Sequence, residues 1–127
     1  MNKLTPNLMV EDVHRTIDFY RDVLGFELIA SVPEEGTLNW AVMKCSSVEL
    51  MFQSWSSLGN DLPQLRKAMP PGPVLLYFDV ESVQILRQQI EGKVTLLKEI
   101  QTTFYGTKEF TIQDCNGFIL TFTEGGN

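Results

Sequence analysis

The pattern of apolar and polar residues in the first half of the chain predicts a strand, a helix and three more strands. Over residues 4–10, Leu8 and Val10 share one face of a half-buried strand. The helix that follows has apolar residues at steps of three and four, with Asp12 suited to cap its start and Gly25 to end it. The other strands are expected at residues 26–32, 38–44 and 48–53.

The composition changes over residues 54–72, which are polar and rich in turn-forming residues. A short helix is expected at about residues 62–69, ended by Pro70, Pro71 and Gly72. We interpret this segment as a linker between two halves of the chain.

The second half repeats the order of elements of the first. A strand at residues 74–80 precedes a helix capped by Ser82, and further strands are expected at residues 94–100, 108–113 and 118–123. The last two strands form a hairpin, since the segment between them contains an Asn-Gly pair. Residues 10–13 and 80–83 also agree at three of four positions, at the same strand-to-helix junction.

These elements predict an α+β fold made of two βαβββ modules. Neither module buries both faces of its sheet, so we expect the two sheets to form one curled mixed sheet, a cup, with the helices outside. The expected organisation is a single domain at residues 1–127, with module one at 1–54, a linker at 55–72 and module two at 73–127.

Composition excludes several classes of function. The 127 residues contain ten Lys and Arg against sixteen Asp and Glu, a formal charge of -6 that argues against a nucleic-acid partner. His14, the single histidine, rules out a metal site built from several imidazoles within the chain, and we expect it to be a solvated helix residue. Cys45 and Cys115 have no zinc-like spacing. With no apolar membrane span or secretory signal in the sequence, we expect a cytoplasmic protein that does not bind membranes.

Several motifs now point to a known family. Residues 19–26 read Phe-Tyr-Arg-Asp-Val-Leu-Gly-Phe, and residues 114–117 form an Asp-x-Asn-Gly hairpin. Together with residues 8–13, 48–52, 76–80 and 105–106, they resemble the vicinal oxygen chelate superfamily of glyoxalases, bleomycin-resistance proteins and extradiol dioxygenases. The resemblance covers nearly the whole chain and implies the same cup-shaped fold. Because unrelated functions share one fold, it does not by itself imply a reaction.

The resemblance also marks four positions at which enzymes of the superfamily hold a divalent metal ion. In this chain they are Thr5, Glu49, Leu75 and Thr121. Only Glu49 is a normal metal ligand, whereas a divalent cation needs several carboxylate, imidazole or carbonyl donors. We therefore expect no metal and no cofactor, unless a ligand cluster lies elsewhere.

Glu49 is the main functional candidate, because Met51 and the apolar residues around it predict a partly apolar environment. It could bind a cationic group or act as a base, and the alternative is a polar residue on the wet face of a strand. Aromatic residues could form walls for a planar ligand, although each could equally pack in a core or a dimer interface. The expected ligand-binding residues are Glu49, Trp40, Met51, Trp55, Tyr77, Phe104, Tyr105, Thr5, Asn7 and Thr121.

The leading functional hypothesis is a metal-free protein of the bleomycin-resistance branch that binds a small cationic or amphipathic molecule, to which its negative charge is complementary. The resemblance implies a homodimer, which is common in that branch. Two alternatives remain open. One is a glyoxalase-like lyase, isomerase or dioxygenase that uses Glu49 with an unrecognised metal site, and the other is a non-catalytic interaction module.

Overall fold

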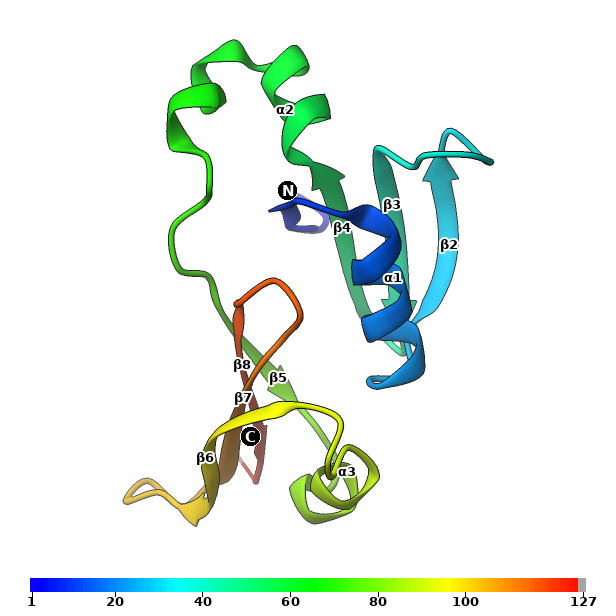
Figure 1. The fold of residues 1–127 in the computed structure, drawn as a ribbon. Coiled ribbons are helices and arrows are strands. Elements are labelled where there is room, and N and C mark those ends of the chain that lie inside the picture. The colour runs from blue at the N-terminus through cyan, green and yellow to red at the C-terminus, as the bar shows by residue number, and fades with distance from the viewer. Residues whose placement is uncertain (126–127) are drawn as a thin grey trace. The chain divides into compact units, whose positions relative to one another are not determined.

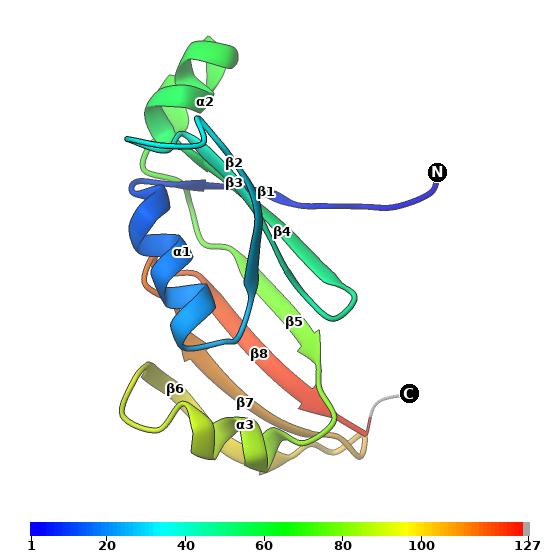
Figure 2. The same ribbon diagram turned by 90° about the vertical axis from the view of Figure 1, so that its right-hand side faces the viewer.

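The computed structural model describes residues 1–125 and divides into two compact units, one spanning Met1–Gly72 and the other beginning at Pro73. Each unit has a helix against a four-stranded mixed sheet (Figures 1 and 2). The predicted α+β fold and its repeated βαβββ order are confirmed. The cup that would join the two sheets stays a prediction. The first compact unit includes residues 55–72, the segment that the composition predicts to be a linker.

The first unit has its strands in the order β1-β4-β3-β2. Strand β1 runs parallel to β4, and the other neighbours are antiparallel. Its βαβββ elements are β1 (Asn7–Val10), α1 (Val13–Asp22), β2 (Glu27–Val32), β3 (Trp40–Cys45) and β4 (Val48–Ser54).

Helix α1 packs on one face of this sheet through an aromatic cluster. Tyr20 is fully buried, and its ring centroid lies 4.9 Å from that of Phe52 on β4 and 5.5 Å from that of Phe26. Burying large rings removes much apolar surface from water, which makes this cluster the centre of the unit's core.

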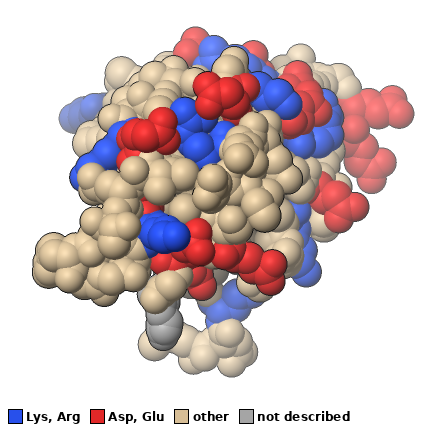
Figure 3. Space-filling model, turned by 90° about the horizontal axis from the view of Figure 1, so that it is seen from below, with Lys and Arg blue, Asp and Glu red and all other residues tan. Residues whose placement is uncertain are grey.

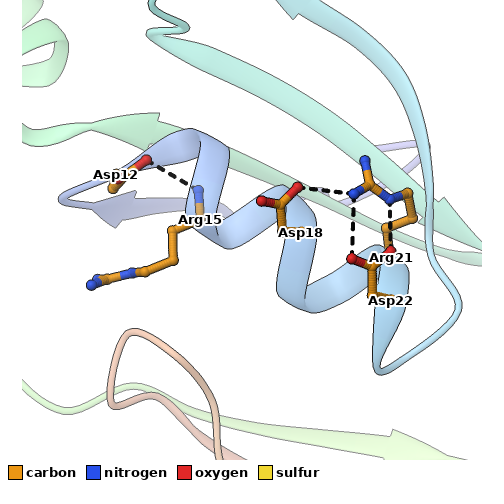
Figure 4. Close-up of polar contacts among 5 residues, drawn as sticks. All are labelled: Asp12, Arg15, Asp18, Arg21 and Asp22. Carbon is orange, nitrogen blue, oxygen red and sulfur yellow. Dashed lines mark hydrogen bonds and ion pairs between the residues drawn. The ribbon is translucent and has the colours of Figure 1, made fainter.

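The ends of α1 follow the sequence prediction. The Asp12 side chain caps the helix by accepting a hydrogen bond from the Arg15 backbone N–H at 3.0 Å (Figure 4). Near the other end, Arg21 donates to Asp22 and Asp18, and this hydrogen bonding from Arg21 lowers the pKa of Asp22. Gly25 has φ +76°, the left-handed conformation predicted for the residue that ends the helix.

Two boundaries in the first unit differ from the prediction. The first strand begins at Asn7 instead of residue 4, because Pro6 has no N–H to donate and pairs only through its carbonyl, which accepts from Met51 N at 2.9 Å. The short helix expected at about residues 62–69 is present as a 3-10 helix, η1 (Pro63–Ala68), and an unpredicted helix, α2 (Trp55–Asp61), precedes it. The Ser54 hydroxyl caps α2 by accepting from Ser57 N, a signal that the sequence interpretation missed.

The second unit repeats this arrangement, with strands in the order β5-β8-β7-β6. Ser82 caps its helix by accepting from Ile85 N, as predicted. The buried rings of Phe110, Phe122 and Phe78 form a continuous row in its core. The elements are β5 (Leu75–Asp79), α3 (Val83–Gln89), β6 (Thr95–Thr102), β7 (Lys108–Gln113) and β8 (Ile119–Glu124).

The Asp-x-Asn-Gly motif has a structural explanation in this unit. Asp114 is buried, and its Oδ1 accepts hydrogen bonds from the backbone N–H groups of Asn116 and Phe118, both at 2.8 Å. Gly117 has φ +84°, which a residue with a side chain rarely adopts. The motif therefore shapes the β7–β8 hairpin and indicates nothing about a reaction.

The surface carries both signs of charge. On the face shown in Figure 3, Lys and Arg side chains lie among Asp and Glu side chains without forming one continuous basic surface. Within residues 1–125, no helix is long and apolar enough to cross a membrane. Cys45 and Cys115 form no disulfide bond within the described residues.

Candidate functional site

The first sheet has one face opposite α1, and most of the predicted ligand residues of this unit share it. Directly opposite residues in a sheet point to the same face, and the register pairs Glu49 with Lys44, Met51 with Val42, and Trp40 with Gln53. Strand β1 adds Asn7, which lies opposite Met51. We call this the helix-free face of the first sheet. Thr5 lies just before β1 and is partly buried.

Glu49 on this face has a basic partner in its own unit. Its Oε2 accepts from Lys3 Nζ at 2.7 Å, and 26% of its side chain is exposed. Lys44, opposite Glu49, adds a second positive charge nearby. A cationic ligand would therefore have to compete with Lys3 for the Glu49 carboxylate.

Gln53, on the same face, makes three side-chain hydrogen bonds that the sequence interpretation did not predict. It is only 8% exposed, and its Nε2 donates to Ser57 Oγ at 2.9 Å and to Asp61 Oδ2 at 2.8 Å. Its Oε1 accepts from Asn7 Nδ2 at 2.9 Å. These bonds join β1 and β4 to α2, and they make Asn7 part of a structural network.

Trp55 is the first residue of α2, in the segment that the composition predicts to be a linker. Its side chain is partly buried, and its indole Nε1 is buried without a hydrogen-bond partner among the described residues. The indole therefore offers a hydrogen-bond donor that the rest of this unit leaves unused.

The helix-free face of the second sheet holds the remaining strand candidates. Tyr77 lies opposite Thr121, and Leu75 lies two residues before it on the same face. Tyr77 is 66% exposed, whereas Thr121 is buried and shares a 2.9 Å hydrogen bond with the Thr111 hydroxyl. This face therefore presents an exposed phenol beside a polar threonine pair.

Glu109 is a second residue that the sequence interpretation missed. It lies on β7 opposite Thr123, on the same helix-free face, because its neighbour Phe110 faces the core. Its Oε2 accepts hydrogen bonds from three hydroxyl groups: Tyr105 at 3.1 Å, Thr107 at 3.0 Å and Thr123 at 3.3 Å. Polar residues that alternate along a strand are ordinarily solvated, so the sequence of β7 alone does not indicate this cluster. The only sequence signal is a set of threonines at alternate positions near β7 and on β8.

Phe104 and Tyr105 lie between β6 and β7, as predicted. Phe104 is 99% exposed, and its ring meets that of Tyr105 edge to face at 4.9 Å. The bond from Tyr105 to Glu109 attaches this aromatic pair to the helix-free face of the second sheet.

Tyr105 should titrate differently from an ordinary tyrosine. Desolvation of the phenol, followed by its hydrogen bond to Glu109, raises the pKa of Tyr105 above the ordinary 10.0. The stability due to the neutral phenol is therefore complete below pH 10 and is lost as pH rises through the higher folded-state pKa. Glu109→Gln is expected to lower the pKa of Tyr105, because it removes the negative charge. Tyrosinate absorbance of each protein, minus that of its Tyr105→Phe counterpart, measures the change, and an unchanged pKa would contradict the contribution of Glu109 to the shift.

The four positions marked by the family resemblance do not fit a metal ion. Glu49 supplies the one carboxylate and is paired with Lys3, while Thr121 is bonded to another threonine. Thr5 and Leu75 add a hydroxyl and an apolar side chain. Nowhere in residues 1–125 do three or more His, Cys, Asp or Glu side chains gather in a way that could hold a metal. The donor set at these four positions therefore supports no reaction step through a bound metal ion.

His14 is exposed on α1, as predicted, but it is also bonded to the loop between β2 and β3. Its Nε2 lies 3.0 Å from the Gly36 carbonyl oxygen and 3.3 Å from the Leu38 backbone nitrogen. Depending on the tautomer, Nε2 donates to the carbonyl or accepts from the backbone N–H. Its contacts are with backbone groups, which indicates a role in holding this loop.

Comparisons with known proteins agree with the fold and the motifs. The chain is 27% identical over 126 residues to a bleomycin resistance protein of Geobacillus stearothermophilus, and the match covers 92% of each chain. The crystal structure of TioX from Micromonospora sp. ML1 matches with a TM-score of 0.77 at 18% identity, covering 99% of this chain and 98% of TioX. A lactoylglutathione lyase from Agrobacterium tumefaciens matches with a TM-score of 0.74 at 18% identity, covering 98% and 95%. Since the family model matches residues 3–122, the chain belongs to the Glyoxalase/Bleomycin resistance protein/Dioxygenase superfamily.

Proposed function

We propose that this protein binds and sequesters a small cationic or amphipathic molecule, and that it does so without a metal ion. The observation that carries the proposal is the donor set at the four positions that hold a metal in enzymes of the superfamily. Glu49 is paired with Lys3, Thr121 is paired with Thr111, and Thr5 and Leu75 complete the set. A site with this chemistry suits binding better than Lewis-acid catalysis.

Two further features support a ligand of this class. The negative charge of the chain favours the approach of a cation. The exposed rings of Tyr77, Phe104 and Tyr105 offer flat apolar surfaces with polar groups beside them. The proposed binding residues are those predicted from the sequence, including Trp40, Met51 and Trp55. The name of the 27%-identical relatives makes bleomycin the first compound to test. The proposal includes a homodimer, which rests on the resemblance, and a cytoplasmic location, which rests on the sequence prediction.

The test combines ligand screening with metal analysis. Protein purified without chelator is mixed with bleomycin and with a panel of basic aromatic compounds, and its melting temperature and tryptophan fluorescence are measured. A ligand at one hundred times its Kd is expected to stabilise the protein by about 2.7 kcal/mol, which raises the melting temperature by several degrees. Elemental analysis, repeated after addition of nickel, zinc, iron or manganese, is expected to find no stoichiometric metal.

Variants at Glu49 separate the alternatives. Glu49→Gln is expected to weaken binding of a cationic ligand, whereas Glu34→Gln, the same charge change in the exposed β2–β3 loop, should not. Unchanged binding in Glu49→Gln would count against the role of this carboxylate. Stoichiometric metal that disappears in Glu49→Gln would overturn the metal-free proposal in favour of a glyoxalase-like enzyme. If no compound shifts the melting temperature, an interaction module becomes the better explanation.

A further inference from the structure

We propose that Glu109 and Tyr105 bind an organic ammonium group on the helix-free face of the second sheet. The inference rests on the proposed function and narrows its ligand class to compounds that carry such a cation. It adds Glu109 as a second carboxylate that recognises a cationic charge, apart from the role proposed for Glu49 in the first unit.

The first argument is the way in which the Glu109 carboxylate is held. Tyr105, Thr107 and Thr123 all donate to Oε2. Thr123 lies on the neighbouring strand β8, and the other two lie in the connection that leads into β7. Thr107 is itself buried and bonded to Thr103 through both hydroxyl groups. The carboxylate is therefore fixed through one oxygen, while Oε1 accepts no hydrogen bond from any described residue. A fixed carboxylate with one free oxygen is a suitable acceptor for an ammonium group.

The second argument is the absence of a compensating charge within the described part of the chain. Among residues 73–125 there are seven acidic residues and four basic ones. Arg87 pairs with Glu91 and Glu99, and no ion pair joins Glu109 to any basic residue within residues 1–125. Lys98 shares this face, but it lies opposite Thr111.

The two carboxylates on the helix-free faces of the two sheets therefore differ. Glu49 already has a cation, because Lys3 lies 2.7 Å from it. Glu109 is surrounded by neutral hydroxyl donors, so an incoming cation has no internal cation to displace. Asp79 lies opposite Thr123 on the same face, so a second carboxylate stands two strands away from Glu109 and adds to the negative potential.

The third argument is the position of the aromatic rings. Tyr105 is held at the Glu109 carboxylate by its own hydroxyl group, yet the residue is 57% exposed. Phe104 lies against it edge to face, so one ring is turned at 90° to the other. A quaternary or protonated amine binds to the face of an aromatic ring, and most strongly where a carboxylate is also within reach. The Glu109 carboxylate and the two rings therefore suit an organic ammonium group. They suit a simple metal cation or a neutral aromatic compound less well.

The test compares choline with 3,3-dimethyl-1-butanol, an uncharged molecule of nearly the same shape. The full chain is titrated with each compound, and backbone amide shifts are followed by NMR. Choline is expected to shift the amides of Tyr105 and Glu109 and to bind about tenfold more tightly than the alcohol. Its affinity is expected to fall as salt is added, while that of the alcohol should not change.

Variants assign the charge selectivity to Glu109. Glu109→Gln keeps an oxygen that can accept from the hydroxyl groups but removes the charge, so the two compounds should then bind about equally. Glu81→Gln, an exposed residue of the same unit, makes the same change in net charge and should preserve the preference for choline. Thr123→Val removes one donor to Oε2 and keeps the charge, and it should also preserve the preference.

Equal binding of the two compounds by the unmodified chain would overturn the inference, as would a preference that survives in Glu109→Gln. If Glu109→Gln fails to fold, the salt dependence and the charge preference of the unmodified chain decide the outcome. A ligand that raises the melting temperature while choline shows no preference would contradict this inference alone. Failure of every compound to raise the melting temperature would contradict the proposed function.

Discussion

Replacement of Phe110 by alanine is expected to lower the free energy of unfolding of the second unit by about 3–5 kcal/mol. Phe110 is fully buried on β7, and its ring lies 5.2 Å from that of Phe122 on β8. Alanine would remove the contact with the Phe122 ring and leave a cavity that the neighbouring strands cannot fill. Urea unfolding followed by far-UV circular dichroism measures the change.

Phe104→Ala is the matched control, because it removes the same side chain from the β6–β7 connection, where Phe104 is 99% exposed. Its effect on stability should stay within about 0.5 kcal/mol. A loss below about 1 kcal/mol in Phe110→Ala would contradict the assignment of Phe110 to the core.

The second large effect is expected in the first unit, where Tyr20→Ala should also cost about 3–5 kcal/mol. Tyr20 is fully buried, and its ring contacts those of Phe19, Phe26 and Phe52. Its loss would remove the aromatic contact between α1 and Phe52 of the first sheet. Trp40 and Trp55 both lie in this unit, so tryptophan fluorescence during urea unfolding reports on it directly.

Tyr20→Phe separates the ring from the hydroxyl group. It keeps all the ring contacts, so it should retain most of the stability that Tyr20→Ala loses. If the two variants lose the same amount, the hydroxyl group and not the ring cluster is the main contribution of Tyr20.

Much of the fold could be predicted from the sequence, because local signals and side-chain periodicity agreed. The caps at Asp12 and Ser82 and the glycine at position 25 mark helix ends through backbone geometry, which depends on few neighbours. The alternation in β4 and β5 likewise placed Phe52 and Phe78 in the cores.

Helix α2 has one local signal, the cap at Ser54, but the rest of its sequence does not predict a helix. Its sequence, Trp-Ser-Ser-Leu-Gly-Asn-Asp, contains weak helix formers and one buried leucine. It is held by the Gln53 side chain, which bonds to Ser57 and Asp61, so its stability depends on a strand residue outside the helix. A local pattern does not contain that contact.

The candidate site, like the fold, could be predicted only in part. The sequence by itself determined the family motifs, the donor types at Thr5, Glu49, Leu75 and Thr121, and the periodicity that sets which residues of one strand share a face. Only the tertiary structure decided which charges are compensated. It paired Glu49 with Lys3 and left Glu109 among three hydroxyl groups. The physical reason is that strand periodicity is a local property of the backbone. An ion pair or a hydrogen-bond cluster instead depends on the distance between side chains that are far apart in sequence, and folding sets that distance.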